Sequence, residues 1–452
     1  MRLFARLLVR VFFRRVEVEG AERLATARPT VLVADHRNGL VDGVLLLATL
    51  PRAPRFLGKS TLFAIPPLWP FLKLARVVPV HRTEDRGAGA RNAGAFATSH
   101  GILRDGGVVA VFPEGISHNE PALQRLHTGA ARIALDASAG GVRHVDTVAV
   151  ALVYDDKSRF RSDALVRVGA PEPVAGWDAA YRADGPAAVR DLTDDLAERL
   201  RRRGPDHDSW RHADRLARLA EIVARSPQDV LPHDVRLAEQ HRIADALADA
   251  ERTGGRYAAM DALTDAFDAY QRDLALLGLT DAQVAASYRS GRLRRLAVAS
   301  IARVVVALPL AAIGVLVHLV PFELVKQVAR LPRNEGVRST VKILGCLLTF
   351  TVTYVAVGLA VGRRFGPVAG MLAGTAAPAC GYLAVRVAER IRRTGLAVDG
   401  ARFARRRGHL ARSVLADRAA VVEAARGVLA GPGTRYRYPT ATPWPASPPS
   451  VP

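Results

Sequence analysis

Short apolar runs alternate with helical patterns between about residues 28 and 175, and this is the most regular pattern in the chain. Runs of roughly four to eight apolar residues, rich in valine, are typical of strands buried on both faces of a sheet. They occur at TVLVAD, VVPV, VVAV and DTVAVALVY, and helical periodicity is seen at GVLLLATL and near residues 90–104 and 128–139. The alternation predicts an α/β fold, a mostly parallel sheet covered by helices, with functional loops at the strand ends.

A basic amphipathic pattern occupies residues 1–15. Arginines recur every four residues, and the apolar side chains fall on the opposite side of a helix. Such a helix suits the headgroup plane of a membrane, with its apolar side in the acyl boundary and its guanidinium groups on lipid phosphate. The alternative is a surface helix that packs on its own domain.

Charged helical patterns, rich in Ala, Asp, Arg and Leu, extend over residues 176–297 and contain no recognisable motif. They predict a solvated helical region, with a cover over the site or a partner surface as alternatives. Residues 396–430 predict a basic helix, and the Pro-rich residues 431–452 predict a disordered tail.

Three apolar stretches lie within residues 298–395. The second, VKILGCLLTFTVTYVAVGLAV, is long enough to cross a bilayer. The third is rich in small residues and follows a GRRFG turn, which favours a helical hairpin with the second. The first contains Arg303 and Pro309, so a kinked span and an interfacial helix are both open. We therefore predict transmembrane or membrane-associated helices over this range.

The net charge of +21, from 64 Lys and Arg against 43 Asp and Glu, predicts anionic partners. Nucleic acid is the weaker possibility, because no usual nucleic-acid module is recognisable and aromatic residues make up only 6% of the chain. Phosphate groups of lipids and substrates are favoured. Cys346 and Cys380 have neither a disulfide nor a zinc spacing, which indicates a reducing, cytoplasmic side. The N-terminus lacks the features of a cleaved signal and is expected to be mature protein.

Candidate chemistry follows three of the predicted strands. HRNGLVD comes after TVLVAD and places His36 and Asp42 in one loop, VVPVHR ends at Arg82, and VVAVFPEG ends at Glu114 and Gly115. A histidine and an aspartate six positions apart also occur by chance, as a loop histidine and a helix-capping residue. Because the carboxyl ends of parallel strands meet at one edge of a sheet, the ordered set predicts that a base, a guanidinium and a carboxylate converge.

These blocks resemble those of the glycerolipid acyltransferase family, which includes the lysophosphatidate and glycerol-3-phosphate acyltransferases, over residues 16–175. ADHRNGLVD, ARVVPVHR, FPEGISH and TVAVALVY stand in the order of the family, and FPEG after an apolar strand is the most specific piece. Five residues rather than the commoner four separate His36 from Asp42. This spacing resembles the subgroup of glycerol-3-phosphate and dihydroxyacetone-phosphate acyltransferases that also carries C-terminal membrane segments.

The resemblance implies a direct acyl transfer. His36 would act as the base toward an acceptor hydroxyl, a task that suits imidazole because its ordinary pKa lies near neutral. Asp42 would fix the tautomer and stabilise the imidazolium. No acyl-enzyme is required, and Ser117 is expected to bind substrate, because it lies outside any GxSxG elbow.

The acceptor phosphate is expected to meet Arg82 and the Gly115 turn, with Arg161 as a second clamp. Glu114 would repel a phosphate, so we expect it to accept from a glycerol hydroxyl or to hold Arg82. No metal or resident cofactor is expected. The predicted donor is acyl-CoA or acyl carrier protein, and the predicted acceptor is glycerol 3-phosphate or its 1-acyl derivative, at the cytoplasmic face of the cell membrane in phospholipid biosynthesis.

Departures from the family pattern leave alternatives open. Asp35 stands where Asn is usual, Ala75 where Gly is frequent, His127 where Lys is common and Ala149 where Pro is usual. They bear on the shape of the acceptor pocket, so another lysophospholipid or a glycolipid is an alternative acceptor. A non-catalytic membrane scaffold or lipid carrier is the alternative from a different class, although the retained reacting residues argue against it.

Overall fold

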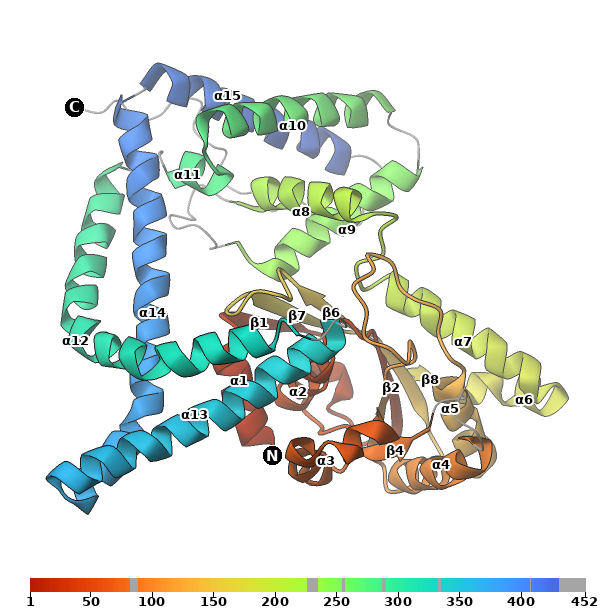
Figure 1. The fold of residues 1–452 in the computed structure, drawn as a ribbon. Helices are drawn as coiled ribbons and strands as arrows, with labels where there is room; N and C mark the ends of the chain where they lie inside the picture. Colours follow the sequence, from red (N-terminus) through yellow and green to blue (C-terminus); the bar gives the residue numbers. More distant parts are fainter. Residues whose placement is uncertain are drawn as a thin grey trace. The chain divides into compact units, whose positions relative to one another are not determined.

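The computed structural model describes residues 1–81, 88–225, 235–253, 257–286, 290–331, 335–406 and 408–430 (Figure 1). Arg82 and the predicted tail over 431–452 therefore lie outside the described residues. The chain forms two compact units. The first comprises Met1–Trp210 with Pro321–Thr349, and the second comprises Arg211–Val320 with Phe350–Pro452.

The first unit is built on an eight-stranded sheet with the order β1-β7-β6-β2-β5-β3-β4, in which β8 also pairs with β6. The five strands from β6 to β4 run parallel, whereas β7 and β8 are antiparallel to β6. This confirms the predicted α/β class with a mostly parallel sheet. The strands are β1 Arg15–Glu19, β2 Thr30–Ala34, β3 Arg55–Lys59, β4 Val78–Val80, β5 Val108–Val111, β6 Asp146–Tyr154, β7 Asp163–Val168 and β8 Glu172–Pro173.

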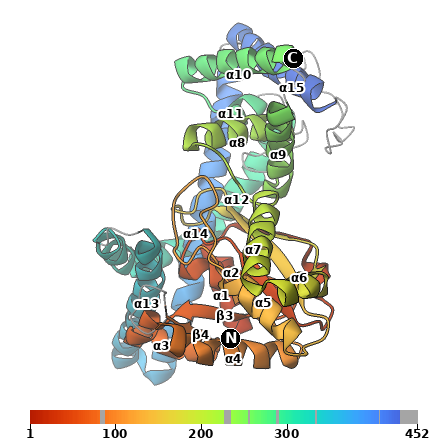
Figure 2. The ribbon, with the colours of Figure 1, turned by 90° about the vertical axis from the view of Figure 1, so that its right-hand side faces the viewer.

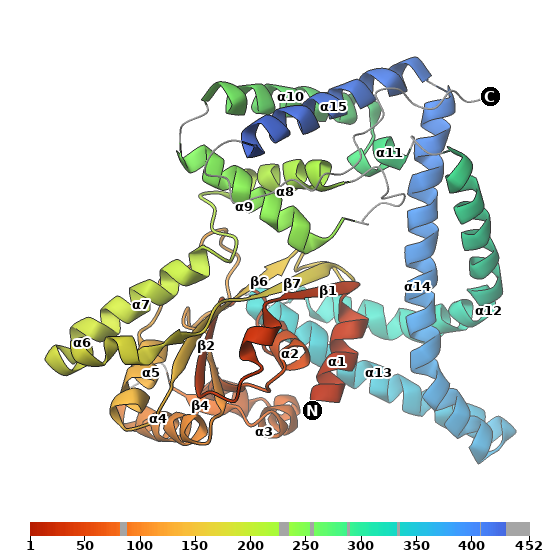
Figure 3. The ribbon, with the colours of Figure 1, turned by 180° about the vertical axis from the view of Figure 1, so that it is seen from behind.

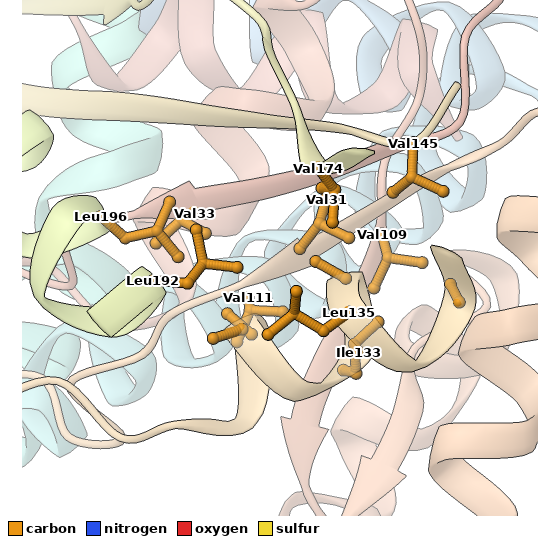
Figure 4. Close-up of a cluster of buried hydrophobic side chains, with 14 of the residues drawn as sticks. Val31, Val33, Val109, Val111, Ile133, Leu135, Val145, Val174, Leu192 and Leu196 are labelled. Carbon is orange, nitrogen blue, oxygen red and sulfur yellow. The ribbon is translucent and has the colours of Figure 1, made fainter. Parts of the chain in front are cut away.

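Successive residues of the central strands are buried on opposite faces of the sheet. Val31 and Val33 of β2 join Val109 and Val111 of β5 in one cluster (Figure 4), whereas Leu32 belongs to a second cluster with residues of α1 and α2. Figure 3 shows these two helices beside the sheet. Because both faces are covered, the strands are apolar without interruption, which is why their pattern could be recognised. The covering helices are α4 Ala88–Arg104, α5 Gly129–Ala139 and α7 Gly185–Arg201 on one side, and α1 Arg2–Phe12 and α2 Leu40–Thr49 on the other; α3, Trp69–Leu74, lies between β3 and β4.

Helix α7 belongs to the first unit, together with the short α6 (Asp178–Ala183) that precedes it (Figure 2). Ala188, Leu192 and Leu196 lie along one side of α7 and are buried in the same cluster as Val33. The predicted boundary at residue 176 therefore does not separate the sheet from a solvated helical region. Eight of the 17 residues of α7 are buried, but half of these are Ala, Thr or Arg, so the charged remainder dominates the average composition.

Helix α1 packs on its own domain through Ala5 and Val9, both buried. Arg2 Nη1 donates to the carbonyl oxygen of Pro51 at 2.9 Å, and Arg6 Nε donates to that of Ala48 at 3.3 Å. These guanidinium groups thus satisfy carbonyl groups at the C-terminal end of α2, where cations are favoured. An apolar strip of α1 remains exposed at Leu3, Leu7 and Val11, and its insertion into a membrane stays a prediction.

The second unit contains a helical core built around a buried ion-pair network. Asp281 Oδ1 accepts from Arg418 Nε at 2.7 Å and from the Tyr270 hydroxyl at 2.9 Å, and its Oδ2 accepts from Arg225 Nε at 2.8 Å. Burial alone would raise the pKa of Asp281, but the two guanidinium charges outweigh it and hold the pKa below its usual value. The helices of this core are α8 Trp210–Ala224, α9 Leu237–Thr253, α10 Tyr257–Leu277, α11 Asp281–Ala286 and α15 Gly408–Leu429.

Among the residues that the structure describes, three helices have segments long and apolar enough to cross a membrane. Within the second unit, residues 350–365 of α13 form the predicted hairpin with α14, because Gly358 and Gly370 bring the two backbones so close that a Cβ on Gly370 would lie 2.7 Å from the Cα of Gly362. The helices and their apolar segments are α12 Ser290–Val328 with Val298–Val328, α13 Glu335–Phe365 with Leu344–Phe365, and α14 Pro367–Arg406 with Pro367–Leu396.

Candidate active site

The candidate site lies at the carboxyl edge of the parallel strands. Val33 of β2 pairs with both Val111 of β5 and Ala149 of β6, so the loops that follow β2 and β5 leave the sheet side by side. The first loop carries His36 and the second carries Glu114. The structure therefore brings together two of the three predicted strand ends; the third strand, β4, ends at Val80, and Arg82 lies outside the described residues.

His36 and Asp42 form the predicted pair. His36 Nδ1 lies 2.9 Å from Asp42 Oδ2, which also accepts from the backbone N–H of Asn38 at 2.7 Å. A carboxylate only accepts hydrogen bonds, so Nδ1 carries the proton and the lone pair is at Nε2. The side chain of Asp42 is fully buried, whereas that of His36 is 20% exposed. The imidazole is thus oriented by a buried anion while remaining accessible as a base.

Tyr154 completes this pair, although the sequence pattern did not single it out. Its hydroxyl donates to the second oxygen of Asp42 at 2.5 Å, and its ring stacks on Phe13 with centroids 5.9 Å apart. Burial, together with the charge of Asp42, raises the pKa of Tyr154 well above its ordinary value of 10.0, so it stays a donor. Its only signal in the sequence is a hydroxyl at the end of the apolar strand TVAVALVY.

Two aromatic rings fix the plane of the imidazole. The His36 ring stacks on Phe112 with centroids 4.3 Å apart and an interplanar angle of 21°. Phe112 in turn stacks on Phe56 of β3, with ring centroids 6.1 Å apart and an interplanar angle of 5°. The phenylalanine of FPEG therefore supports the base directly.

Glu114 supports the backbone of His36. Its Oε1 accepts from the His36 N–H at 2.6 Å, and its Oε2 accepts from the Gln124 N–H at 3.0 Å and bonds to His118 Nε2. Burial alone would raise the pKa of Glu114, but the hydrogen bond and charge of His118 and the two backbone N–H groups outweigh it and lower the pKa. Both oxygens thus accept protein donors, so Glu114 positions the loop of His36; acceptance from a glycerol hydroxyl stays a prediction.

Gly115 and Ser117 shape the loop after β5. Gly115 has a φ of +69°, and a Cβ there would lie 3.0 Å from Cδ2 of His127, so a side chain would be both strained and crowded. Ser117 Oγ accepts from the N–H of Gly39 at 2.9 Å, which joins this loop to the start of α2. Ser117 therefore has a structural contact; substrate binding by Ser117 or by the Gly115 turn stays a prediction.

Arg161 lies at the end of α1. Its Nη1 donates to the carbonyl oxygen of Arg10 at 2.7 Å and also to that of Phe13. The residue has a φ of +63° and is buried. The structure thus uses Arg161 to cap the carbonyl groups at the C-terminus of α1, which differs from the predicted second phosphate clamp. Sequence alone cannot distinguish these roles, since both need a guanidinium at a turn.

Asp35 and Arg37 hold His36 from both sides. Asp35 Oδ1 accepts from the N–H of Leu152 at 2.7 Å, and Oδ2 accepts from Arg37 Nε at 2.9 Å. Arg37 Nη2 donates to the carbonyl oxygen of Pro205 at 2.7 Å, beyond the end of α7. Burial raises the pKa of Asp35 to about 6, although Arg37 opposes the shift. The loop of the base is therefore anchored to β6 and to the segment after α7.

Comparison with known proteins places this site in residues 15–154, which match the family model described as Acyltransferase. Glycerol-3-phosphate O-acyltransferase 2 of Saccharomyces cerevisiae is 31% identical over 124 residues, a match that spans 26% of this chain and 17% of the yeast protein. The crystal structure of the 1-acyl-sn-glycerophosphate (LPA) acyltransferase PlsC of Thermotoga maritima matches with a TM-score of 0.33 and 19% identity, over 44% of this chain and 75% of that chain.

Proposed function

Since residues 15–154 form a domain of the glycerolipid acyltransferase family, we propose that this chain is an O-acyltransferase. It moves a fatty acyl group from a thioester, carried by CoA or acyl carrier protein, to a hydroxyl of glycerol 3-phosphate or 1-acylglycerol 3-phosphate. The observation that carries the proposal is the His36–Asp42 pair, in which a buried, doubly supported carboxylate holds an accessible imidazole.

The chemistry proceeds in two steps. Nε2 of His36 takes the proton of the acceptor hydroxyl as its oxygen attacks the thioester carbonyl carbon, and Asp42 stabilises the imidazolium that forms. When the tetrahedral intermediate collapses, the C–S bond breaks and the imidazolium returns the proton to the leaving thiolate. The products are the new ester and the free thiol of the carrier. No metal takes part in either step, and the acyl group is never bound to the protein.

The acceptor is proposed to be anionic. The surplus of basic residues gives the chain a net charge of +21, which favours phosphate-bearing substrates and acidic lipid surfaces over nucleic acid. Family resemblance assigns the phosphate to Arg82. The three apolar helices support a location in the cell membrane, with the site on the cytoplasmic face.

The test is an acceptor panel with the full chain in membranes. Membranes containing the protein are incubated with radiolabelled acyl-CoA and, separately, glycerol 3-phosphate, dihydroxyacetone phosphate, 1-acylglycerol 3-phosphate and a neutral monoacylglycerol. We expect label in the product of at least one of the first three and little in that of the last. Thioester hydrolysis without transfer to any acceptor would contradict the proposal.

A further inference from the structure

Residues of four helices of the first unit, α4, α5, α6 and α7, line a cleft of about 600 Å³. Figure 2 shows these helices side by side. The volume of the cleft lies within the range of small-molecule sites. No step of the proposed reaction uses it. The residues that decide its chemistry are Phe96, Thr128, Arg132, Asp136, Tyr181 and Arg190.

Its charged groups favour an anion. Arg132 and Arg190 are exposed, and among the described residues neither guanidinium has a salt-bridge or hydrogen-bond partner. Asp136, the acidic residue in the lining, accepts the hydroxyl of Tyr181, and this bond raises the pKa of Tyr181 above its ordinary value. Two cations therefore face the cleft while the carboxylate is engaged by a neutral phenol. Paired arginines of this kind suit phosphate groups, which accept their planar forks.

The lining of the cleft also contains two aromatic side chains. Phe96 from α4 and Tyr181 from α6 both face the cleft. Aromatic faces bind planar heterocycles by stacking, and arginine adds to such contacts. An anion that also carries a flat ring satisfies both parts of the lining, whereas free phosphate satisfies only the arginines.

The cleft adjoins the candidate active site through one loop. Thr128, at its rim, directly follows His127, whose backbone N–H donates to the carbonyl oxygen of Pro113 at 2.8 Å. The ring of His127 packs beside the Gly115 turn. Moreover, α5 follows β5, and α4 follows β4, so the first turns of both helices start at the sheet edge that carries His36. A long ligand held in the cleft can thus extend one end toward the base.

We propose that this cleft binds the nucleotide end of a CoA-type acyl thioester, an adenosine that carries phosphate groups. Arg132 and Arg190 bind the phosphates, Phe96 and Tyr181 contact the base, and the thioester extends past Thr128 toward His36. The inference rests on the proposed function and narrows its donor to a nucleotide carrier. An acyl carrier protein, by contrast, would dock on an extended surface and leave the cleft unused.

Binding is tested without acyl transfer. Desulfo-CoA, which has no thiol to acylate, is titrated into the purified full chain in detergent by calorimetry. The double variant Arg132→Gln/Arg190→Gln should weaken binding by roughly tenfold or more, since each phosphate contact to arginine is charge-assisted. Arg104→Gln, at the exposed C-terminal end of α4, is the matched control and should bind like the wild type. Unchanged binding by the double variant would overturn the proposal, as would no binding of desulfo-CoA by the wild type.

Steady-state kinetics then distinguish the contribution of the nucleotide to donor binding from that of the acyl-pantetheine part. In the double variant the KM for acyl-CoA should rise roughly tenfold, whereas the KM for S-acyl-pantetheine, which lacks the nucleotide, should not change. An equal rise for both donors would refute a nucleotide site, and so would activity with acyl carrier protein alone. If desulfo-CoA binds through the two arginines but no acceptor is acylated, the proposed function fails and the binding site stands.

Discussion

Replacing Tyr154 with phenylalanine removes one hydroxyl from the candidate site and leaves the ring in place. In the wild type this hydroxyl donates to Asp42 Oδ1 at 2.5 Å, while Asp42 Oδ2 serves His36 and the Asn38 N–H. After Tyr154→Phe, one oxygen of a fully buried carboxylate loses its donor. The carboxylate is then free to turn away from the imidazole that it orients.

The size of the effect follows from the kind of bond that is lost. A hydrogen bond to a charged group contributes about 1.5–3 kcal/mol. If that support is needed fully in the transition state, the loss corresponds to a roughly 10- to 100-fold fall in kcat, because each 1.4 kcal/mol is about tenfold in rate. The KM for acceptor and donor should not change, since Tyr154 is positioned to act through Asp42 and not on substrate.

The assay is initial-rate acyl transfer by the full chain in membranes, with Tyr270→Phe as matched control. Tyr270 also donates to a buried aspartate, Asp281, but in the second unit. Both variants should lose stability, and only Tyr154→Phe should lose kcat. In the background of Asp42→Asn, Tyr154→Phe should cause no further fall, because the two residues act as one chain. A Tyr154→Phe enzyme with kcat within twofold of the wild type would refute the reasoning.

Four further substitutions test other parts of the structure. Gly115→Ala forces a side chain into a backbone with φ +69° and against the His127 ring, so we expect about 1–2 kcal/mol of lost stability and reduced kcat; an equally stable and active variant would contradict this. Asp35 has a folded pKa of about 6 against 3.8 when exposed, so its contribution to stability is complete below 3.8 and is lost as the pH rises through 6. The Asp35→Asn side chain does not titrate, so in chemical denaturation its free energy of unfolding should equal that of the wild type below pH 3.8 and exceed it by up to about 3 kcal/mol at neutral pH. A difference between the two proteins that does not change with pH would contradict this prediction. Between the apolar helices α12 and α13, the hydroxyl of Tyr354 lies 2.9 Å from Nε2 of His318. Nδ1 of His318 lies 2.7 Å from the carbonyl oxygen of Gly314. Tyr354→Phe should lower the free energy of unfolding in detergent by about 0.6 kcal/mol. Gly381→Ala should lower it by more, because a Cβ there would lie 2.6 Å from His318 Nε2. A larger loss for Tyr354→Phe than for Gly381→Ala would contradict this packing.

The elements that could be predicted are those whose burial is complete. The strands β2, β5 and β6 are covered on both sides, and the helices α2 and α5 are buried along a wide face, so their apolar pattern is strong. β1, by contrast, reads RVEVE and is only partly buried, so charged residues obscure it. The sequence places α7 in a solvated region because half of its eight buried residues are Ala, Thr or Arg, which do not form a strong apolar pattern.

The residues of the candidate site also differ in how far the sequence could predict them. The pairing of His36 and Asp42 could be predicted because both stand in the short motif ADHRNGLVD and one loop holds them together. Tyr154 contacts Asp42, which lies 112 positions earlier in the chain, and Glu114 contacts His36, which lies 78 positions earlier. The local sequence pattern contains no information on such distant contacts. Arg161 was assigned to phosphate because its charge was known and its neighbours at the end of α1 were not.

The most direct test of the central claim is transfer of a radiolabelled acyl group by His36→Ala in membranes, beside the wild type at matched protein levels. We predict a loss of roughly three orders of magnitude or more in label transferred, with folding and membrane association unchanged, because the variant lacks the imidazole proposed to take the hydroxyl proton. A variant that transfers label at a rate near that of the wild type would show that the imidazole is not the base.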